Sequence, residues 1–348
     1  MSAGPEAAPL ALTQGDPSGI GPEIALRAWA ALRDAGPAFA IYGDPDWFAH
    51  EADRLGLPAP QTIDHPSEAR DLIGRRPAII PVPLEATPVP GRPSAANAQG
   101  VIAAIERACA DGVSGAARGI VTCPIAKSVL YEAGFTFPGH TEFVAHLTRE
   151  AAVSGPRGPI MMLAAPGLRV SLVSIHLSLR DALAALSVER IIHTAQVTAQ
   201  ALKTDFAIER PRLAVAGLNP HAGEGGALGR EEIEIVAPAV ERLRAEGLDV
   251  SGPLPPDTLF HAEARARYDA AICLYHDQGL IPVKTLDFHG GVNVTLGLPV
   301  VRASPDHGTA FDIAGTGAAR PDSLIAALKL AGEMGRNRER ALSRSKSA

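Results

Sequence analysis

Three histidines of this 348-residue chain stand where a side chain could do chemistry. His176, His221 and His276 each come directly after, or just beyond, a short apolar run typical of a buried strand. The carboxyl ends of parallel strands meet at one edge of a sheet, so the three imidazoles could lie together. Three imidazoles with open positions suit a catalytic site for Zn²⁺, Co²⁺ or a similar ion. The alternative is three separate exposed or core histidines, because they lie far apart in the sequence.

A second group of residues could hold an anion. Lys284 and Arg302 lie in or beside apolar segments, where an unpaired charge is costly. Either a bound anion or an internal carboxylate must compensate them, and we favour the anion. His140 and Thr141 follow a Pro-Gly break. They could hold a phosphate or carboxylate oxygen, although an ordinary loop explains them equally well.

Carboxylates near these histidines could orient them. Asp277 directly follows His276, and Asp257 and Asp306 occur in the flanking motifs. Carboxylates of this kind fix the ring and tautomer of a metal-binding histidine. For Asp257, the cap of a helix is the competing interpretation.

The elements that would position these side chains alternate along the chain. The apolar runs LALTQ, AFAIYG, AIIPV and GIVTC predict strands, and helices are expected at about 45–55 and 95–110. This alternation predicts a mostly parallel sheet with helices on both faces, and the length allows two domains. The first turn, GDPSGIGPE, is not the dinucleotide motif GxGxxG. It is either a phosphate cradle or a tight turn without a ligand.

Composition excludes several classes of protein. A net charge of −6 gives no reason to expect nucleic acid or an anionic membrane as a partner. No apolar run approaches the roughly 20 residues that span a bilayer, and the first residues lack the pattern of a secretion signal. Three cysteines form neither a CxxC pair nor a disulfide framework. We therefore expect a cytoplasmic protein.

Six motifs in order resemble the 4-hydroxythreonine-4-phosphate dehydrogenase family of pyridoxal phosphate biosynthesis. They are TQGDPSGIGPE, GFTFPGHTEF, GLNPHAGEGG, GPLPPDTLF, YHDQGLIPVK and GVNVTLGLPVVRASPDHGTAFDIAGTG. The resemblance covers residues from about 10 to 330 and is highly specific. The departures are small, such as Cys123 and Ala126 in TCPIAK, and none removes a ligand or an anion contact.

The resemblance implies a homodimeric dehydrogenase that depends on NAD or NADP and on one divalent metal ion per subunit, such as Zn, Mg, Co or Mn. The implied fold is two-domain α/β/α, like isocitrate and isopropylmalate dehydrogenases, with the active site in the interdomain cleft at a dimer interface. We expect a first domain from residues 1–130 and 304–348 and a second from residues 131–303.

The resemblance also implies roles for individual residues. The metal would bind to His176, His221 and His276, and the small phosphorylated substrate to His140, Thr141, Lys284, Asn293 and Arg302. The cofactor would bind to the loop containing Asp306, His307, Gly308, Thr309, Asp312 and Gly315. We expect Lys284 and Asp277 to be catalytic, with metal-assisted hydride transfer followed by decarboxylation.

Three other functions stay open at this point. A paralogue of the same family could oxidise a phosphorylated four-carbon acid such as phosphothreonate or phosphoerythronate. A metal-dependent aldolase-type lyase also joins histidine-bound metal to a phosphorylated substrate, and it needs no nicotinamide. A non-catalytic protein could bind the same phosphorylated metabolite without turnover. The loop after Asp306 argues against the last two.

Overall fold

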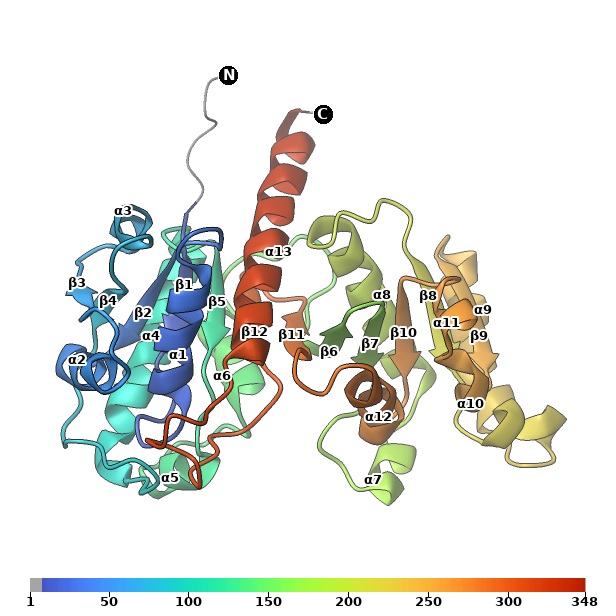
Figure 1. Ribbon diagram of the computed structural model, residues 1–348. Helices are drawn as coiled ribbons and strands as arrows, with labels where there is room; N and C mark the ends of the chain where they lie inside the picture. Colours follow the sequence, from blue (N-terminus) through green and yellow to red (C-terminus); the bar gives the residue numbers. More distant parts are fainter. Residues whose placement is uncertain (1–7, 348) are drawn as a thin grey trace. The chain divides into compact units, whose positions relative to one another are not determined.

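The computed structural model describes residues 8–347, with side chains from residue 8 to residue 344. The chain forms two compact units (Figure 1). The first contains the described residues up to Ala152 together with Leu298–Glu339, and the second contains Val153–Gly297 together with the residues from Arg340. Both units combine a sheet with helices, which confirms the predicted α/β class. No helix within the described residues has the length and apolar character needed to span a bilayer.

The sheet of the first unit is entirely parallel and has the order β3-β4-β2-β1-β5-β12. Its strands are β1 (Leu10–Thr13), β2 (Phe39–Gly43), β3 (Gln61–Thr62), β4 (Ala78–Pro81), β5 (Gly119–Thr122) and β12 (Val301–Pro305). The chain moves outward on one side of β1 and then returns to its other side at β5. Such a change of direction is where ligands bind in open parallel sheets.

The helices of the first unit pack on both faces of this sheet. They are α1 (Gly21–Leu32), α2 (Pro45–Arg54), η1 (Pro66–Glu68), α3 (Ala69–Leu72), η2 (Ala95–Asn97), α4 (Ala98–Ser114), α5 (Lys127–Glu132), α6 (His140–Leu147) and most of α13 (Asp322–Ser347). Ala11 shares a buried cluster with Ala104 and Ile105 of α4. Leu10 and Leu12 are fully buried outside that cluster, because alternate strand residues point to opposite faces.

The second unit has a mixed sheet of order β11-β6-β7-β10-β8-β9. Its strands are β6 (Ile160–Ala165), β7 (Leu168–Leu172), β8 (Arg212–Ala216), β9 (Asp249–Leu254), β10 (Ala270–Cys273) and β11 (Val292–Leu296). β6 is antiparallel to both β7 and β11. A two-residue turn joins β6 to β7, and its Gly167 adopts φ 74°, which glycine tolerates without strain.

Helices cover this second sheet as well. They are α7 (Leu179–Ala184), α8 (Val188–Thr204), α9 (Ala237–Ala245), α10 (Pro256–Leu259), α11 (Ala262–Arg265) and α12 (His276–Leu286), with η3 (Pro220–Gly226) and the π-helical turn η4 (Glu232–Val236). Leu280 and Val283 of α12 pack with Val170 and Ala271 in one buried cluster. Thr198 of α8 instead donates a 2.9 Å hydrogen bond to Ser171 of β7.

The observed units divide the chain differently from the expected domains, which placed residues 131–303 together. Residues up to Ala152 belong to the first unit, and so do those from Leu298. The physical reason is the packing of α6 on α4. Phe143 and Val144 of α6 join the same buried cluster as Ile105 of α4. The Pro-Gly break before His140 therefore separates two helices of the first unit and does not mark the boundary between the units.

Candidate active site

Arg302 is the buried cation of the first unit. It lies on β12, next to β5 in the sheet, and is 2% exposed. Its Nη2 donates a 2.7 Å hydrogen bond to Oγ1 of Thr122, at the end of β5. Burial lowers the pKa of the Arg302 guanidinium to about 10, and nearby Cys109 and Glu142 oppose that shift. The group thus stays cationic at neutral pH, and a guanidinium is suited to grip a carboxylate or phosphate.

His140 is the first residue of α6, and the positive charge of Arg302 acts on its imidazole. Burial lowers the pKa of its imidazole well below the usual value, and the positive charges of Arg302 and Lys127 lower it further. The ring is therefore neutral at physiological pH. Its Nε2 is buried and makes no hydrogen bond with any described residue. A neutral imidazole at a helix N-terminus, followed by Thr141, can bind an anionic oxygen of a ligand.

Lys127 and Thr122 lie beside His140 and Arg302, and the sequence did not single them out. A Cβ placed on Gly139 would lie 3.4 Å from Nζ of Lys127 and 3.6 Å from Oε2 of Glu142. The ammonium and the carboxylate therefore both sit beside the residue that precedes His140. Their signal in the sequence was TCPIAK, a strand end followed by a lysine, which is too common to identify a site.

In the second unit, His176 and His276 lie side by side. Their ring centroids are 6.1 Å apart. His276 is the first residue of α12, three residues beyond the end of β10 at Cys273, and its Nδ1 lies 2.7 Å from Oδ1 of Asp277. This contact leaves Nε2 of His276 as the nitrogen for a metal ion, the usual arrangement for a metal-binding histidine.

His221 occupies a strained turn. It begins a run of left-handed residues in η3, including the non-glycine residues Ala222 and Glu224. Oε1 of the buried Glu232 accepts hydrogen bonds from the backbone N–H groups of Leu218 (2.8 Å) and Asn219 (2.7 Å), which fixes the start of the turn. Strain of this kind is retained at functional sites when the surroundings enforce it.

The structure thus brings two of the three predicted metal ligands together. His221 is largely exposed, with Nδ1 3.3 Å from Oε2 of Glu224. Among the described residues, no three His, Cys, Asp or Glu side chains are arranged to hold a metal ion. The types of side chain nevertheless fit a divalent ion. Two imidazoles are adjacent, and the carboxylate of Asp277 contacts Nδ1 of one of them, His276.

Two other predicted substrate residues belong to the second unit. Lys284 lies in the last turn of α12, with Nζ 5.6 Å from the ring centroid of Phe288. Asn293 lies on β11, and its Oδ1 is buried without a hydrogen bond to any described residue. A buried amide oxygen without a partner is expected where a ligand supplies the missing donor.

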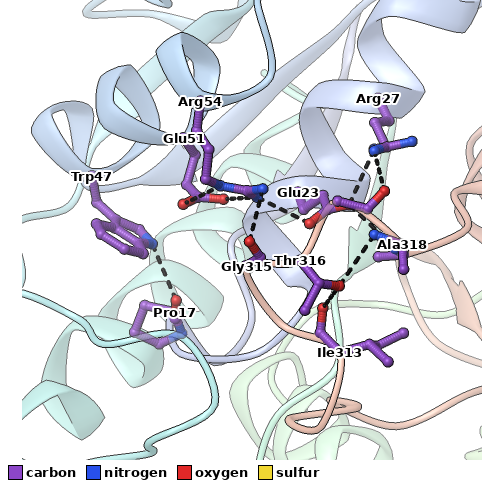
Figure 2. A network of polar contacts seen from close by, with 12 residues as sticks. Pro17, Glu23, Arg27, Trp47, Glu51, Arg54, Ile313, Gly315, Thr316 and Ala318 are labelled. Carbon is purple, nitrogen blue, oxygen red and sulfur yellow. Dashed lines mark hydrogen bonds and ion pairs between the residues drawn. The ribbon is translucent and has the colours of Figure 1, made fainter.

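The predicted cofactor residues form one loop between β12 and α13. The N–H of Asp306 donates to Oγ of Ser323 (3.1 Å), and Nδ1 of His307 lies 3.0 Å from the carbonyl oxygen of Gly308. The carbonyl of Thr309 accepts a 3.0 Å hydrogen bond from Ile20, just before α1. Figure 2 shows the far end of this loop bound by charged side chains of α1 and α2.

The glycine-rich turn after β1 is explained by packing. Gly15 has φ +71°, and a Cβ there would lie 2.5 Å from the carbonyl oxygen of Pro124. The N–H of Asp16 also donates to that carbonyl at 2.8 Å. Of the two interpretations of this turn, the structure favours a tight turn packed against the connection after β5.

Comparison with known proteins places the chain in a family. A family model described as pyridoxal phosphate biosynthetic protein PdxA matches residues 36–331. A 4-hydroxythreonine-4-phosphate dehydrogenase from Caulobacter vibrioides is 57% identical over 95% of this chain and 98% of its own length. One from Maricaulis maris is also 57% identical, over 93% of this chain and 96% of its own length. The crystal structure of the enzyme of that name from Klebsiella pneumoniae aligns with a TM-score of 0.84 at 40% identity, covering 94% of this chain and all of the other.

Proposed function

The chain belongs to the PdxA family of pyridoxal phosphate biosynthetic proteins, and on that premise we propose how its residues perform the reaction of a 4-hydroxythreonine-4-phosphate dehydrogenase. The observation that carries this function is the 57% identity to a named dehydrogenase over 98% of that protein's length. The enzyme oxidises 4-phosphohydroxy-L-threonine in pyridoxal 5′-phosphate biosynthesis. The paralogue and lyase readings are not favoured by these relatives.

The chemistry follows from the substrate. A nicotinamide cofactor held by the loop Asp306–Gly315 would accept the hydride that leaves C3 of the substrate, and the C3 hydroxyl would lose its proton. The alcohol becomes a ketone, and the product is 2-amino-3-oxo-4-phosphobutanoate. As a β-keto acid it loses CO₂, because the ketone accepts the electrons of the breaking bond, and it yields 3-amino-2-oxopropyl phosphate.

The anion-binding residues would hold the substrate during this reaction. Arg302 offers a buried guanidinium, and neutral His140 with Thr141 offers hydrogen bonds at the start of α6. Asn293 would accept a hydrogen bond from the substrate at its buried Oδ1, and Lys284 would orient an anionic group and transfer a proton. Cations fixed before the substrate arrives stabilise negative charge without reorganisation during the reaction.

The metal ligands would be His176, His221 and His276. A divalent ion such as Zn, Mg, Co or Mn at these residues would act as a Lewis acid on the C3 hydroxyl. Asp277 would hold the ring of His276 through its 2.7 Å contact with Nδ1, so that Nε2 carries the lone pair. The loop Asp306–Gly315 would bind the nicotinamide cofactor.

The assay that tests this function follows the absorbance of the reduced nicotinamide. Purified protein is mixed with 4-phosphohydroxy-L-threonine, a divalent ion and NAD or NADP, and the product is identified as 3-amino-2-oxopropyl phosphate. We expect turnover with this substrate to exceed turnover with phosphothreonate. A preference for the threonate would assign the paralogue activity, and turnover without nicotinamide reduction would assign the lyase.

A homodimer is supported by exposed apolar side chains of the second unit. Leu179 and Leu183 of α7 are 63% and 47% exposed, and Ile281 and Phe288 are 64% and 70% exposed. The two leucines also line a cavity of about 180 Å³ with Leu218. Exposed apolar patches of this kind mark protein–protein contacts, and a second copy of the chain is the partner we propose.

Replacing Leu179 and Leu183 together by glutamate should convert the dimer to a monomer and abolish turnover. A carboxylate buried at an interface without a partner is strongly destabilising. Analytical ultracentrifugation measures the mass, and NADH formation measures the activity. The matched control is Val113→Glu, at a position on α4 that is 47% exposed in the first unit. A fully active monomer would contradict the shared active site.

A further inference from the structure

The loop proposed to bind the cofactor is held by a buried charge network in the first unit (Figure 2). Its centre is Glu23 of α1, whose side chain is 1% exposed. Arg27 of α1 and Arg54 of α2 both pair with this carboxylate, at 3.2 Å and 2.9 Å. Glu51 supports the network from α2 through a 2.7 Å ion pair with Arg54.

Both arginines also bind the loop directly. Nη1 of Arg54 donates a 3.1 Å hydrogen bond to the carbonyl oxygen of Gly315, and Nη2 of Arg27 donates a 2.6 Å bond to that of Gly317. Oε1 of Glu23 accepts a 3.2 Å bond from the N–H of Ala319. Three successive points of the loop are therefore fixed to α1 and α2 by charge-assisted hydrogen bonds, which are stronger than neutral ones.

The loop cannot easily take another shape at these points. Gly315 and Gly317 have φ values of +75° and +78°, in the left-handed region that glycine tolerates. A Cβ on Gly315 would lie 2.7 Å from Cβ of Pro90. The glycines permit the turn, but their backbone freedom also makes it costly to order. The arginine contacts offset that cost before any ligand binds.

We propose that Arg54, Arg27 and Glu23 are positioning residues for the nicotinamide cofactor, because they hold the loop between β12 and α13, which contains Asp306–Gly315, in its binding shape. The inference rests on the proposed function of that loop. A site that is already ordered binds its ligand more tightly, because the ligand does not have to order it. The network would thus set affinity for NAD or NADP while leaving the phosphorylated substrate to other residues.

The test is Arg54→Met, which keeps an aliphatic side chain. It removes the hydrogen bonds that Arg54 itself makes to the loop and to Glu23. We expect the Kd for the cofactor, measured by calorimetry, and its KM to rise on the order of tenfold to a hundredfold. The KM for 4-phosphohydroxy-L-threonine should change less than about twofold, and kcat at saturating cofactor should stay close to wild type. These estimates follow from losing loop preorganisation. Arg54→Lys should recover part of the affinity.

Two matched controls separate this role from general stability. Glu51→Gln alters the 2.7 Å ion pair of Arg54 but touches no residue of the loop. Arg212→Met removes a comparable ion pair, 3.0 Å from Asp269, in the second unit. Both should leave the cofactor Kd close to wild type. Hydrogen exchange at residues 313–319 should increase only in the Arg54 variant.

The outcomes distinguish this inference from the proposed function. If wild-type protein turns over but Arg54→Met binds the cofactor as tightly as wild type, the positioning role is wrong and the function stands. The positioning role would also be wrong if Arg54→Met raised the KM for the cofactor and the KM for the phosphorylated substrate equally, and if Arg212→Met did the same. If the wild type binds neither NAD nor NADP, the proposed function itself fails and the inference fails with it.

Discussion

Replacing Arg302 by methionine should lower kcat/KM for 4-phosphohydroxy-L-threonine by roughly 100- to 1,000-fold, the usual cost of removing a fixed group that stabilises an anion. The guanidinium is 2% exposed and is aimed by a 2.7 Å hydrogen bond to Thr122. The cofactor Kd should stay unchanged, because Arg302 precedes the loop that begins at Asp306. Steady-state kinetics and calorimetry check both expectations.

Companion variants separate charge from geometry at this position. Arg302→Lys keeps a cation but loses the fork of two N–H groups, so it should recover only part of the activity. Thr122→Val should cause a smaller loss, because the cation remains and only its orientation is relaxed. Since the pKa of Arg302 is about 10, substrate binding should also weaken as the pH rises through that value. A folded Arg302→Met protein with wild-type kcat/KM would contradict the anion role.

Removing the divalent ion should abolish turnover, and His276→Ala should lower kcat at least about 1,000-fold, because a Lewis acid contributes several kcal/mol to the reaction barrier. His276 lies beside His176, with ring centroids 6.1 Å apart. Turnover should return when Zn, Co, Mn or Mg is added to chelated wild-type protein. Metal content is measured by mass spectrometry beside the kinetics.

Two further variants test the arrangement around His276. Asp277→Asn should reduce metal affinity about 10- to 100-fold, because the carboxylate that orients the ring is lost. His193→Ala is the matched control, at an exposed position of α8 in the same unit. It should leave metal content and activity unchanged. Metal-free protein that turns over at the wild-type rate would refute the metal proposal.

The class of fold was predictable because it depends on local patterns. Apolar runs that alternate with amphipathic segments indicated strands and helices, and β1, β2, β4 and β5 all lie in the predicted runs. The sequence contained less information about which strands pair with which. The antiparallel pairing of β6 with β11, for example, depends on contacts between segments about 130 residues apart in sequence. The position where the first unit ends depends likewise on the packing of α6.

The site was predictable only where residues of unusual type stand at strand ends. Arg302 in an apolar run and His140 after a break were identified, and in the structure the charge of Arg302 helps to lower the pKa of the buried His140. Glu23, Arg27 and Arg54 were missed, because ordinary helices also carry such residues on their surfaces. Only the folded chain shows that their side chains meet a loop that lies 261 to 296 residues away in sequence.

The interrupted course of the chain through its first unit bears on its synthesis. That unit contains β12, which pairs with β5, although residues 153–297 of the second unit come between the two strands in the sequence. A ribosome therefore completes every strand of the second unit before it releases the last strand of the first. Domains usually fold in the order in which they are translated. Here every strand of the second unit is made while the β5 edge of the first unit has no β12 to pair with, and an unpaired strand edge is a site where another chain can add.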